Sequence, residues 1–227
     1  MSELTKAILW ANQTRKPHTI LRTDGTQTVE HHQGIGVMKL FADRLGALNQ
    51  CRGLSALFLF FQEVSMKKIG IIMGSDSDLP IIKKATDMLK ALEIPFEVHI
   101  YSAHRTPVEA RDFAVNARAN NFGALICAAG MAAHLAGAIA ANTTLPVIGI
   151  PCKGGMMDGL DALLATVQMP TGIPVATVAV NGGANAALLA AQILAVSDTE
   201  IAAKLDAKRI ADAKVVLEKD AGVMEKL

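Results

Sequence analysis

Apolar runs alternate with amphipathic segments along most of this chain. From residue 66 onward, short runs of mostly apolar residues are separated by longer segments whose apolar residues recur with helical spacing. Strands that alternate with helices of about 10–15 residues predict βαβ units and a parallel sheet. The apolar runs that predict strands are 67–74, 96–102, 123–130, 145–151 and 172–180.

The same pattern predicts how the sheet is covered. Runs that are apolar throughout are typical of strands buried on both faces, and right-handed crossovers place helices on those faces. The expected fold is therefore α/β, a three-layer α/β/α sandwich with a parallel sheet. A last, more charged helix over 198–220 has only an approximate apolar stripe, and it packs either on its own domain or along a neighbouring subunit. The other helical segments are 78–93, 106–121, 133–144, 159–169 and 184–195.

The first 65 residues differ from the rest of the chain in composition and in the spacing of their apolar residues. They contain Trp10, which is the only tryptophan, and a segment over 14–34 that sustains neither a strand nor a helix period. Their apolar run at 54–61 comes too late for a secretory signal. We therefore predict two parts. Residues 1–65 form an N-terminal extension that is poorly ordered or results from an upstream start, and residues 66–227 form the domain.

Composition narrows the class of protein. The net charge of +1 argues against a nucleic-acid surface built on excess positive charge. No apolar run approaches the roughly 20 residues that cross a bilayer, so we expect no membrane partner. Neither the cysteines nor the His31–His32 pair has metal-ligand spacing, which favours a solvated loop over a metal site at the histidines. The odd cysteine set of Cys51, Cys127 and Cys152 favours a reduced, cytoplasmic compartment.

Polar residues and glycines follow the predicted strands at the point where each strand ends. In an open parallel sheet, ligands bind outside the carboxyl ends of the strands, so these residues are expected to meet at one edge. The stretches are 74–78, 102–107, 130–134 and 151–155.

The stretch "GSDSD" over 74–78 has two interpretations. Asp78 or Ser77 can cap the helix that begins near Leu79, with Pro80 in its first turn. A cap does not explain Ser75, whose hydroxyl beside free helix N–H groups suits a phosphate, ribose or carboxylate. The pattern favours a binding site over a plain cap, and the spacing is not that of a Walker loop.

The stretch "SAHRTP" over 102–107 indicates catalysis more directly. Thr106 is expected to cap the next helix, which holds the loop short. Arg105 suits a bidentate grip on phosphate, and His104 suits proton transfer near neutral pH. His134 is expected one turn inside a helix, where a packing role and a catalytic role are both open.

Together these stretches resemble the N5-carboxyaminoimidazole ribonucleotide mutase family of purine synthesis. The resemblance covers residues 67–220, and its most specific motifs are "SAHRTP" and "LLATVQMPTGIPV". It implies a flavodoxin-like fold, a homo-octamer, and an enzyme that moves a carboxyl group from the exocyclic nitrogen to ring carbon 4 of aminoimidazole ribonucleotide. It also implies that no metal, biotin or ATP is needed.

The resemblance also implies roles for individual residues. His104 is the proton-transfer residue. Ser75 and Asp78 contact the nucleotide, with Asp78 suited to the ribose hydroxyls, and Ser102 and Arg105 suit the phosphate. The loop that lines the carbon dioxide pocket contributes Gly130, Ala132 and His134.

Two departures and two rival functions remain. Where the family often has "GGAAHLPG", this chain has "GMAAHLAG", so Met131 either narrows the pocket or points away from it, and Ala136 replaces a proline. One rival is the related carboxylase that uses free carbon dioxide, which tends to carry Lys at the position of Arg105. The other rival is a non-catalytic nucleotide-binding module, which would give His104 no task.

Overall fold

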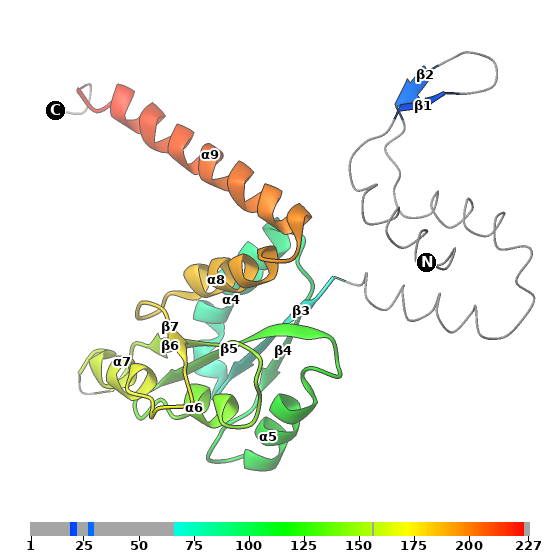
Figure 1. Ribbon diagram of the computed structural model, residues 1–227. Helices are drawn as coiled ribbons and strands as arrows, with labels where there is room; N and C mark the ends of the chain where they lie inside the picture. Colours follow the sequence, from blue (N-terminus) through cyan, green and yellow to red (C-terminus); the bar gives the residue numbers. More distant parts are fainter. Residues whose placement is uncertain (1–18, 22–26, 30–65, 156, 225–227) are drawn as a thin grey trace, which may run out of the picture. The chain divides into compact units, whose positions relative to one another are not determined.

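The computed structural model describes residues 19–21, 27–29, 66–155 and 157–224, and the chain divides into two compact units, Met1–Val64 and Ser65–Leu227. In the first unit, β1 (Thr19–Leu21) and β2 (Gln27–Val29) pair antiparallel (Figure 1). The sequence analysis did not predict this hairpin. The predictions for His31 and His32 lie outside the described residues.

The second unit is built on a five-stranded sheet in which every neighbouring pair is parallel. The strand order is β4-β3-β5-β6-β7. Counted from the first strand of this sheet, that is the 2-1-3-4-5 order of flavodoxin-like folds, which confirms the predicted fold class. The strands are β3 (Lys68–Met73), β4 (Phe96–Ile100), β5 (Phe122–Gly130), β6 (Val147–Cys152) and β7 (Ala176–Thr177).

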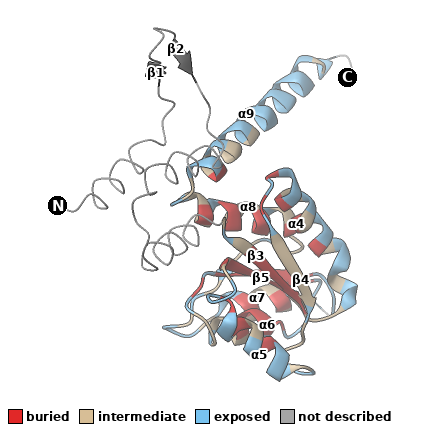
Figure 2. Ribbon diagram, turned by 90° about the vertical axis from the view of Figure 1, so that its right-hand side faces the viewer, coloured by how far each residue is buried: buried red, intermediate tan, exposed pale blue. Residues whose placement is uncertain are grey.

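Helices cover both faces of this sheet and form two separate cores. One core packs β3, β5 and β6 against α4 (Leu79–Ala91) and α8 (Gly183–Ala195). The other core packs the opposite face against α5 (Pro107–Asn116) and α6 (Leu135–Ala140), with α7 (Leu160–Val167) beside β6. β6 is buried at every position, and β3 and β5 are buried over most of their length (Figure 2). Their apolar runs are therefore explained by burial on two faces.

Small residues allow α4 and α8 to approach closely. A Cβ atom at Gly183 would overlap the backbone carbonyl oxygen of Ile81. Four alanines of α8 are fully buried: Ala186, Ala187, Ala190 and Ala191. The scarcity of large side chains in this layer thus reflects tight packing between the helices.

One predicted strand is largely wrong. The run 172–180 forms only the two-residue β7, because Gly172 adopts a left-handed conformation and Pro174 supplies no N–H for a ladder. β7 is an edge strand, where pairing on one side gives little support to a longer strand.

The last helix, α9 (Thr199–Ala221), is attached to the unit only near its start. The Asp198 carboxylate accepts hydrogen bonds from the backbone N–H groups of Glu200 and Ile201, and Ile201 is buried. The Lys204 ammonium binds the Glu93 carboxylate at 2.7 Å. Beyond that point α9 is mostly exposed (Figure 2). Among the described residues, no helix is long and apolar enough to span a membrane.

Candidate active site

Two loops that follow neighbouring strands form a cleft at the carboxyl edge of the sheet. The cleft has a volume of about 390 Å³. Because β3 and β4 are parallel, the residues after each strand reach the same edge. The lining residues are Gly74, Ser75 and Asp76 after β3, and Ile100, Ser102, Arg105 and Thr106 at the end of β4 and in the loop after it.

The Ser75 hydroxyl caps the chain after β3. It accepts a hydrogen bond from the backbone N–H of Ser77 at 3.3 Å and donates to the Asp76 carboxylate at 3.1 Å. The turn over Asp76–Asp78 is a 3-10 helix, and α4 follows it directly. The prediction that Ser77 or Asp78 caps α4 through its side chain is wrong, because Asp78 makes no such bond. Its carboxylate is therefore not used by the helix.

The loop after β4 is held by Ser102. Its hydroxyl oxygen accepts hydrogen bonds from the backbone N–H groups of His104 and Arg105, at 3.3 and 3.2 Å. The Thr106 hydroxyl was predicted to cap α5, but it instead bonds the backbone N–H and carbonyl of Ser102 at 2.8 and 3.2 Å. These bonds fix the backbone that carries His104 and Arg105.

Arg105 joins the two loops. Its guanidinium donates a 2.7 Å hydrogen bond to the backbone carbonyl of Gly74. A guanidinium has several further N–H donors in a rigid fork, which suits the oxygens of a phosphate. Arg105 therefore places a cation on the wall of the cleft beside two serine hydroxyls.

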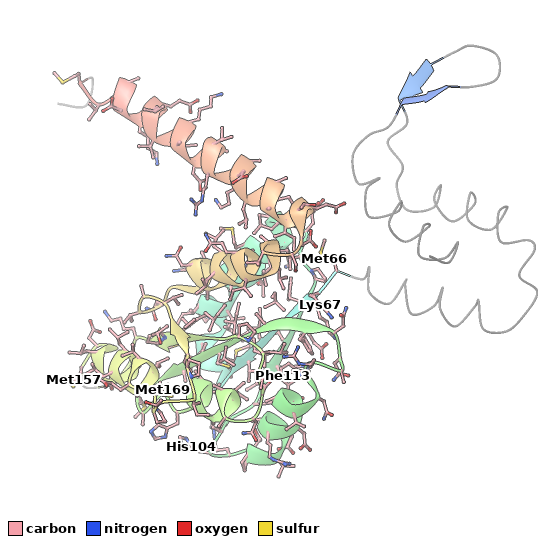
Figure 3. The ribbon with its side chains drawn as sticks, viewed as in Figure 1. Met66, Lys67, His104, Phe113, Met157 and Met169 are labelled. Carbon is pink, nitrogen blue, oxygen red and sulfur yellow. The ribbon has the colours of Figure 1, made fainter. Side chains whose placement is uncertain are left out.

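His104 and His134 are hydrogen-bonded to each other, with 3.0 Å between the His104 Nε2 and His134 Nδ1 atoms. His104 follows β4 and His134 follows β5, and these strands flank β3. Figure 3 shows His104 at the end of the unit opposite Met66 and Lys67, which lead into β3. His134 lies at the N-cap of α6, so its predicted place one turn inside the helix is wrong. Both imidazoles are exposed and able to exchange a proton.

Asp78 is half-buried beside the end of β6. Burial raises the pKa of its carboxyl above 3.8, a hydrogen bond with the Cys152 thiol lowers the pKa, and the nearby Asp76 charge raises it. The net result is a raised pKa, which means that folding makes this carboxylate harder to ionise.

We expect Asp78→Asn to relieve this cost. Since the folded protein binds the Asp78 proton more tightly than the unfolded chain does, stability from this group falls as pH rises from about 3.8 through the raised pKa. The variant should therefore gain more stability relative to wild type at about pH 7 than at about pH 4. Urea unfolding at the two pH values measures this, and an equal difference at both would contradict it.

Met131 has a left-handed backbone, with a φ of 55°. Its side chain is 64% exposed, and its Cγ lies beside Gly155 rather than in the lining of the cleft. Only glycine adopts such a backbone without cost, so a side chain at this position strains the loop. The departure therefore affects the backbone of the loop more than the cleft.

We expect Met131→Gly to raise the free energy of unfolding by about 0.5–1 kcal/mol. The gain is the left-handed penalty of about 1–2 kcal/mol less the entropy cost of glycine. Met131→Ala, which keeps the penalty, is the control and should give no such gain. Denaturant unfolding at fixed protein concentration measures both variants, and equal stability for the two would show that the backbone is not strained.

The structure brings the predicted site residues together in three groups. Ser75, Ser102 and Arg105 line the cleft, and His104 pairs with His134. Asp78 lies near Cys152, which pairs in register with Gly130 at the strand ends, and Ala132 is exposed in the loop that follows.

The cleft has further lining residues to which the sequence analysis assigned no individual role. Gly74 and Asp76 lie in the predicted stretch 74–78, and Ile100 is the last residue of β4. Their place at the ends of strands was the available signal. Within residues 66–155 and 157–224, no group of three His, Cys, Asp or Glu side chains is arranged to hold a metal ion.

Comparison with known proteins assigns the chain to a family. The family model described as AIR carboxylase matches residues 68–214, about two thirds of the chain. The chain belongs to the AIR carboxylase family. This confirms the family resemblance drawn from the motifs around His104 and after β6.

Individual relatives agree with the family. The N5-carboxyaminoimidazole ribonucleotide mutase of Pyrococcus abyssi is 51% identical over 143 residues, which are 63% of this chain and 82% of the relative. The phosphoribosylaminoimidazole carboxylase of Saccharomyces cerevisiae is 51% identical over 138 residues, which are 61% of this chain but 24% of the yeast protein. The crystal structure of Treponema denticola PurE has a TM-score of 0.61 and 29% identity, covering 68% of this chain and 97% of that one.

Proposed function

We propose that this chain is an N5-carboxyaminoimidazole ribonucleotide mutase, an isomerase of purine biosynthesis. The observation that carries the proposal is the hydrogen-bonded pair of His104 and His134 beside a cleft lined by Arg105 and two serines. The proposal is supported by the mutases of this family, which match the chain over most of their own length. The product is 4-carboxy-5-aminoimidazole ribonucleotide.

The cleft supplies the binding groups. Arg105 and Ser102 hold the phosphate through charge-assisted hydrogen bonds. Ser75 and Asp78 hold the nucleotide, with the Asp78 carboxylate accepting from ribose hydroxyls. The segment with Gly130, Ala132 and His134 holds the carbon dioxide. Small residues in that segment let the molecule approach the backbone.

His104 moves the proton. The bond between the exocyclic nitrogen and the carboxylate breaks, carbon dioxide leaves, and the nitrogen takes a proton from His104. Ring carbon 4 then forms a bond to carbon dioxide, and His104 takes the carbon 4 proton, which restores the aromatic ring and the starting imidazolium. His134 Nδ1, 3.0 Å from His104 Nε2, orients the imidazole between the two steps. Holding both fragments in one site replaces a bimolecular encounter.

Assay with two substrates tests the proposal against the direct carboxylase. We expect turnover of N5-carboxyaminoimidazole ribonucleotide, and much slower product formation from aminoimidazole ribonucleotide with bicarbonate. The reverse preference would overturn the mutase assignment. The non-catalytic alternative predicts no deuterium exchange at carbon 4 of aminoimidazole ribonucleotide, which proton NMR in D₂O measures.

We further propose that the enzyme is a cytoplasmic homo-octamer. Apolar side chains are exposed along α7 and α9, including Leu160, Leu164, Ile210 and Leu217, each at least 45% exposed. Apolar surface of this extent supports burial against further copies of the chain. Analytical ultracentrifugation should give a mass about eight times 23.9 kDa, and a monomer would overturn this part of the proposal.

The N-terminal extension is proposed to have no part in catalysis. Both described cores and every candidate site residue lie between Met66 and Met224. Comparison of kcat for the full chain and for residues 66–227 tests this, and loss of activity in the shorter chain would assign a role to residues 1–65.

A further inference from the structure

Two serine hydroxyls line the cleft, and they differ in the hydrogen bonds that they already make. A serine hydroxyl has one proton to donate and two lone pairs that accept. The Ser102 oxygen accepts from the backbone N–H groups of His104 and Arg105, at 3.3 and 3.2 Å, so both lone pairs are used. Within residues 66–155 and 157–224, no group accepts the Ser102 proton. Ser102 is therefore left as a donor, which suits a phosphate oxygen.

Ser75 is left with the opposite capacity. Its hydroxyl donates to the Asp76 carboxylate at 3.1 Å, because an ionised carboxylate only accepts. Its oxygen accepts from the backbone N–H of Ser77 at 3.3 Å. One lone pair then remains for a ligand, and it suits a group that donates. A phosphate dianion has only acceptors, whereas a ribose hydroxyl can donate.

Asp76 is the residue that creates this difference. It lines the cleft, and its side chain is exposed. Among the described residues, the Ser75 hydroxyl is the one hydrogen-bond partner of its carboxylate. The negative charge of Asp76 opposes the binding of a phosphate, so Asp76 does not serve the phosphate itself. Its contact with Ser75 is the role that the geometry supports.

We propose that Asp76 is a positioning residue that turns the Ser75 proton away from the ligand, so that Ser75 accepts from a ribose hydroxyl while Ser102 donates to the phosphate. The inference rests on the proposed function, in which both serines hold the nucleotide. A nucleotide bound in reverse would place its phosphate against the lone pair of Ser75. Asp76 thus acts through Ser75 and sets the direction in which the nucleotide lies.

The first test measures which ribose hydroxyl Ser75 accepts from. Calorimetry gives the Kd of aminoimidazole ribonucleotide and of its 2′-deoxy and 3′-deoxy forms. Wild type should bind the form that lacks the hydroxyl facing Ser75 about fivefold more weakly, since one neutral hydrogen bond is lost. Ser75→Ala should reduce that preference to below twofold for one of the two forms. A Ser75→Ala variant that discriminates as wild type does against both forms would overturn the proposal.

Two neutral variants of Asp76 separate hydrogen-bond polarity from charge. Asp76→Asn removes the charge but keeps an oxygen that accepts the Ser75 proton, so it should keep the fivefold preference. Asp76→Ala removes the acceptor and lets the Ser75 hydroxyl rotate toward water, so the preference should fall below twofold. Both variants should keep kcat within twofold of wild type. Equal preferences in the two variants would show that Asp76 acts through charge alone and would overturn the proposal.

Asp87 supplies the matched control for the loss of a carboxylate. It lies on α4, where it pairs with Lys83 at 3.5 Å, and it does not line the cleft. Asp87→Ala should keep the wild-type preference between the ribonucleotide and both deoxy forms. A loss of preference equal to that of Asp76→Ala would show that the effect is not specific to the cleft.

Binding measurements keep this test distinct from that of the proposed function, because they require no turnover. A wild-type chain that binds aminoimidazole ribonucleotide without converting the carboxylated substrate fails the proposed function, and the Kd ratios of the variants then still test Asp76. A chain that does not bind it overturns both proposals.

Discussion

His104→Asn is expected to lower kcat by about 10²–10⁴-fold while nucleotide binding stays within about threefold of wild type. General acid–base catalysis by one side chain contributes this much, and asparagine can neither take nor give the proton. The amide of asparagine is too short to reach the position of His104 Nε2, so the bond to His134 is lost. The Ser102 hydroxyl still holds the loop through the backbone N–H groups of residues 104 and 105, so the cleft should keep its shape. Steady-state kinetics and calorimetry with aminoimidazole ribonucleotide measure the two effects.

A second histidine provides the control for this variant. His99 lies on β4, bonded to Glu97 at 2.8 Å and stacked on Tyr101, and it does not line the cleft. His99→Asn should therefore keep kcat within about threefold. His104→Asn should also abolish deuterium exchange at ring carbon 4. A variant that retained near-full turnover or exchange would show that another group moves the proton.

Arg105→Met is expected to raise KM by about 10²-fold with a much smaller change in kcat. The variant keeps an apolar stem but loses hydrogen bonds to a charged phosphate, each of which contributes about 1.5–3 kcal/mol. Arg105→Lys should fall between, because an ammonium supplies charge without the planar fork. Initial-rate kinetics over a wide substrate range measure all three enzymes.

Arg118 supplies the matched control for the loss of a guanidinium. It follows α5 and donates a 3.0 Å hydrogen bond to the Thr144 hydroxyl, and it does not line the cleft. Arg118→Met should leave KM within twofold. Similar KM values for the Arg105 and Arg118 variants would show that Arg105 does not bind the phosphate.

The local sequence predicted where the helices begin more accurately than it predicted the hydrogen bonds that cap them. Helices were expected at Leu79 and after Thr106, and α4 and α5 begin there. The capping bonds differ because a cap requires a particular backbone geometry, which neighbouring contacts decide. Thr106 bonds to Ser102 in the preceding loop, and Ser75 rather than Asp78 caps the turn. The sequence names the residues able to cap, and the folded loop selects among them.

The spacing of apolar residues predicted the fold class, but it did not predict every strand, for a physical reason. Because β3 is buried on both faces, its residues form a continuous apolar run, and such a run can be recognised from the sequence alone. The run 172–180 has a similar composition, yet at the sheet edge it forms only Ala176–Thr177. The residues of this run are at most partly buried, with Val175 and Val178 packed against the two cores, so an apolar composition does not by itself require a strand.

The sequence by itself determined the βαβ alternation, the family motifs and the residue types at the strand ends. Only the tertiary structure decided which of these residues meet. The strand order places β4 and β5 on either side of β3, so His104 and His134, which are 30 residues apart, come within 3.0 Å. It also brings the end of β6 to α4, since Cys152 and Ile82 lie in the same core. The physical reason is that each apolar strand could pair with several of the other strands. The packing of the whole sheet against its two helical layers selects one strand order.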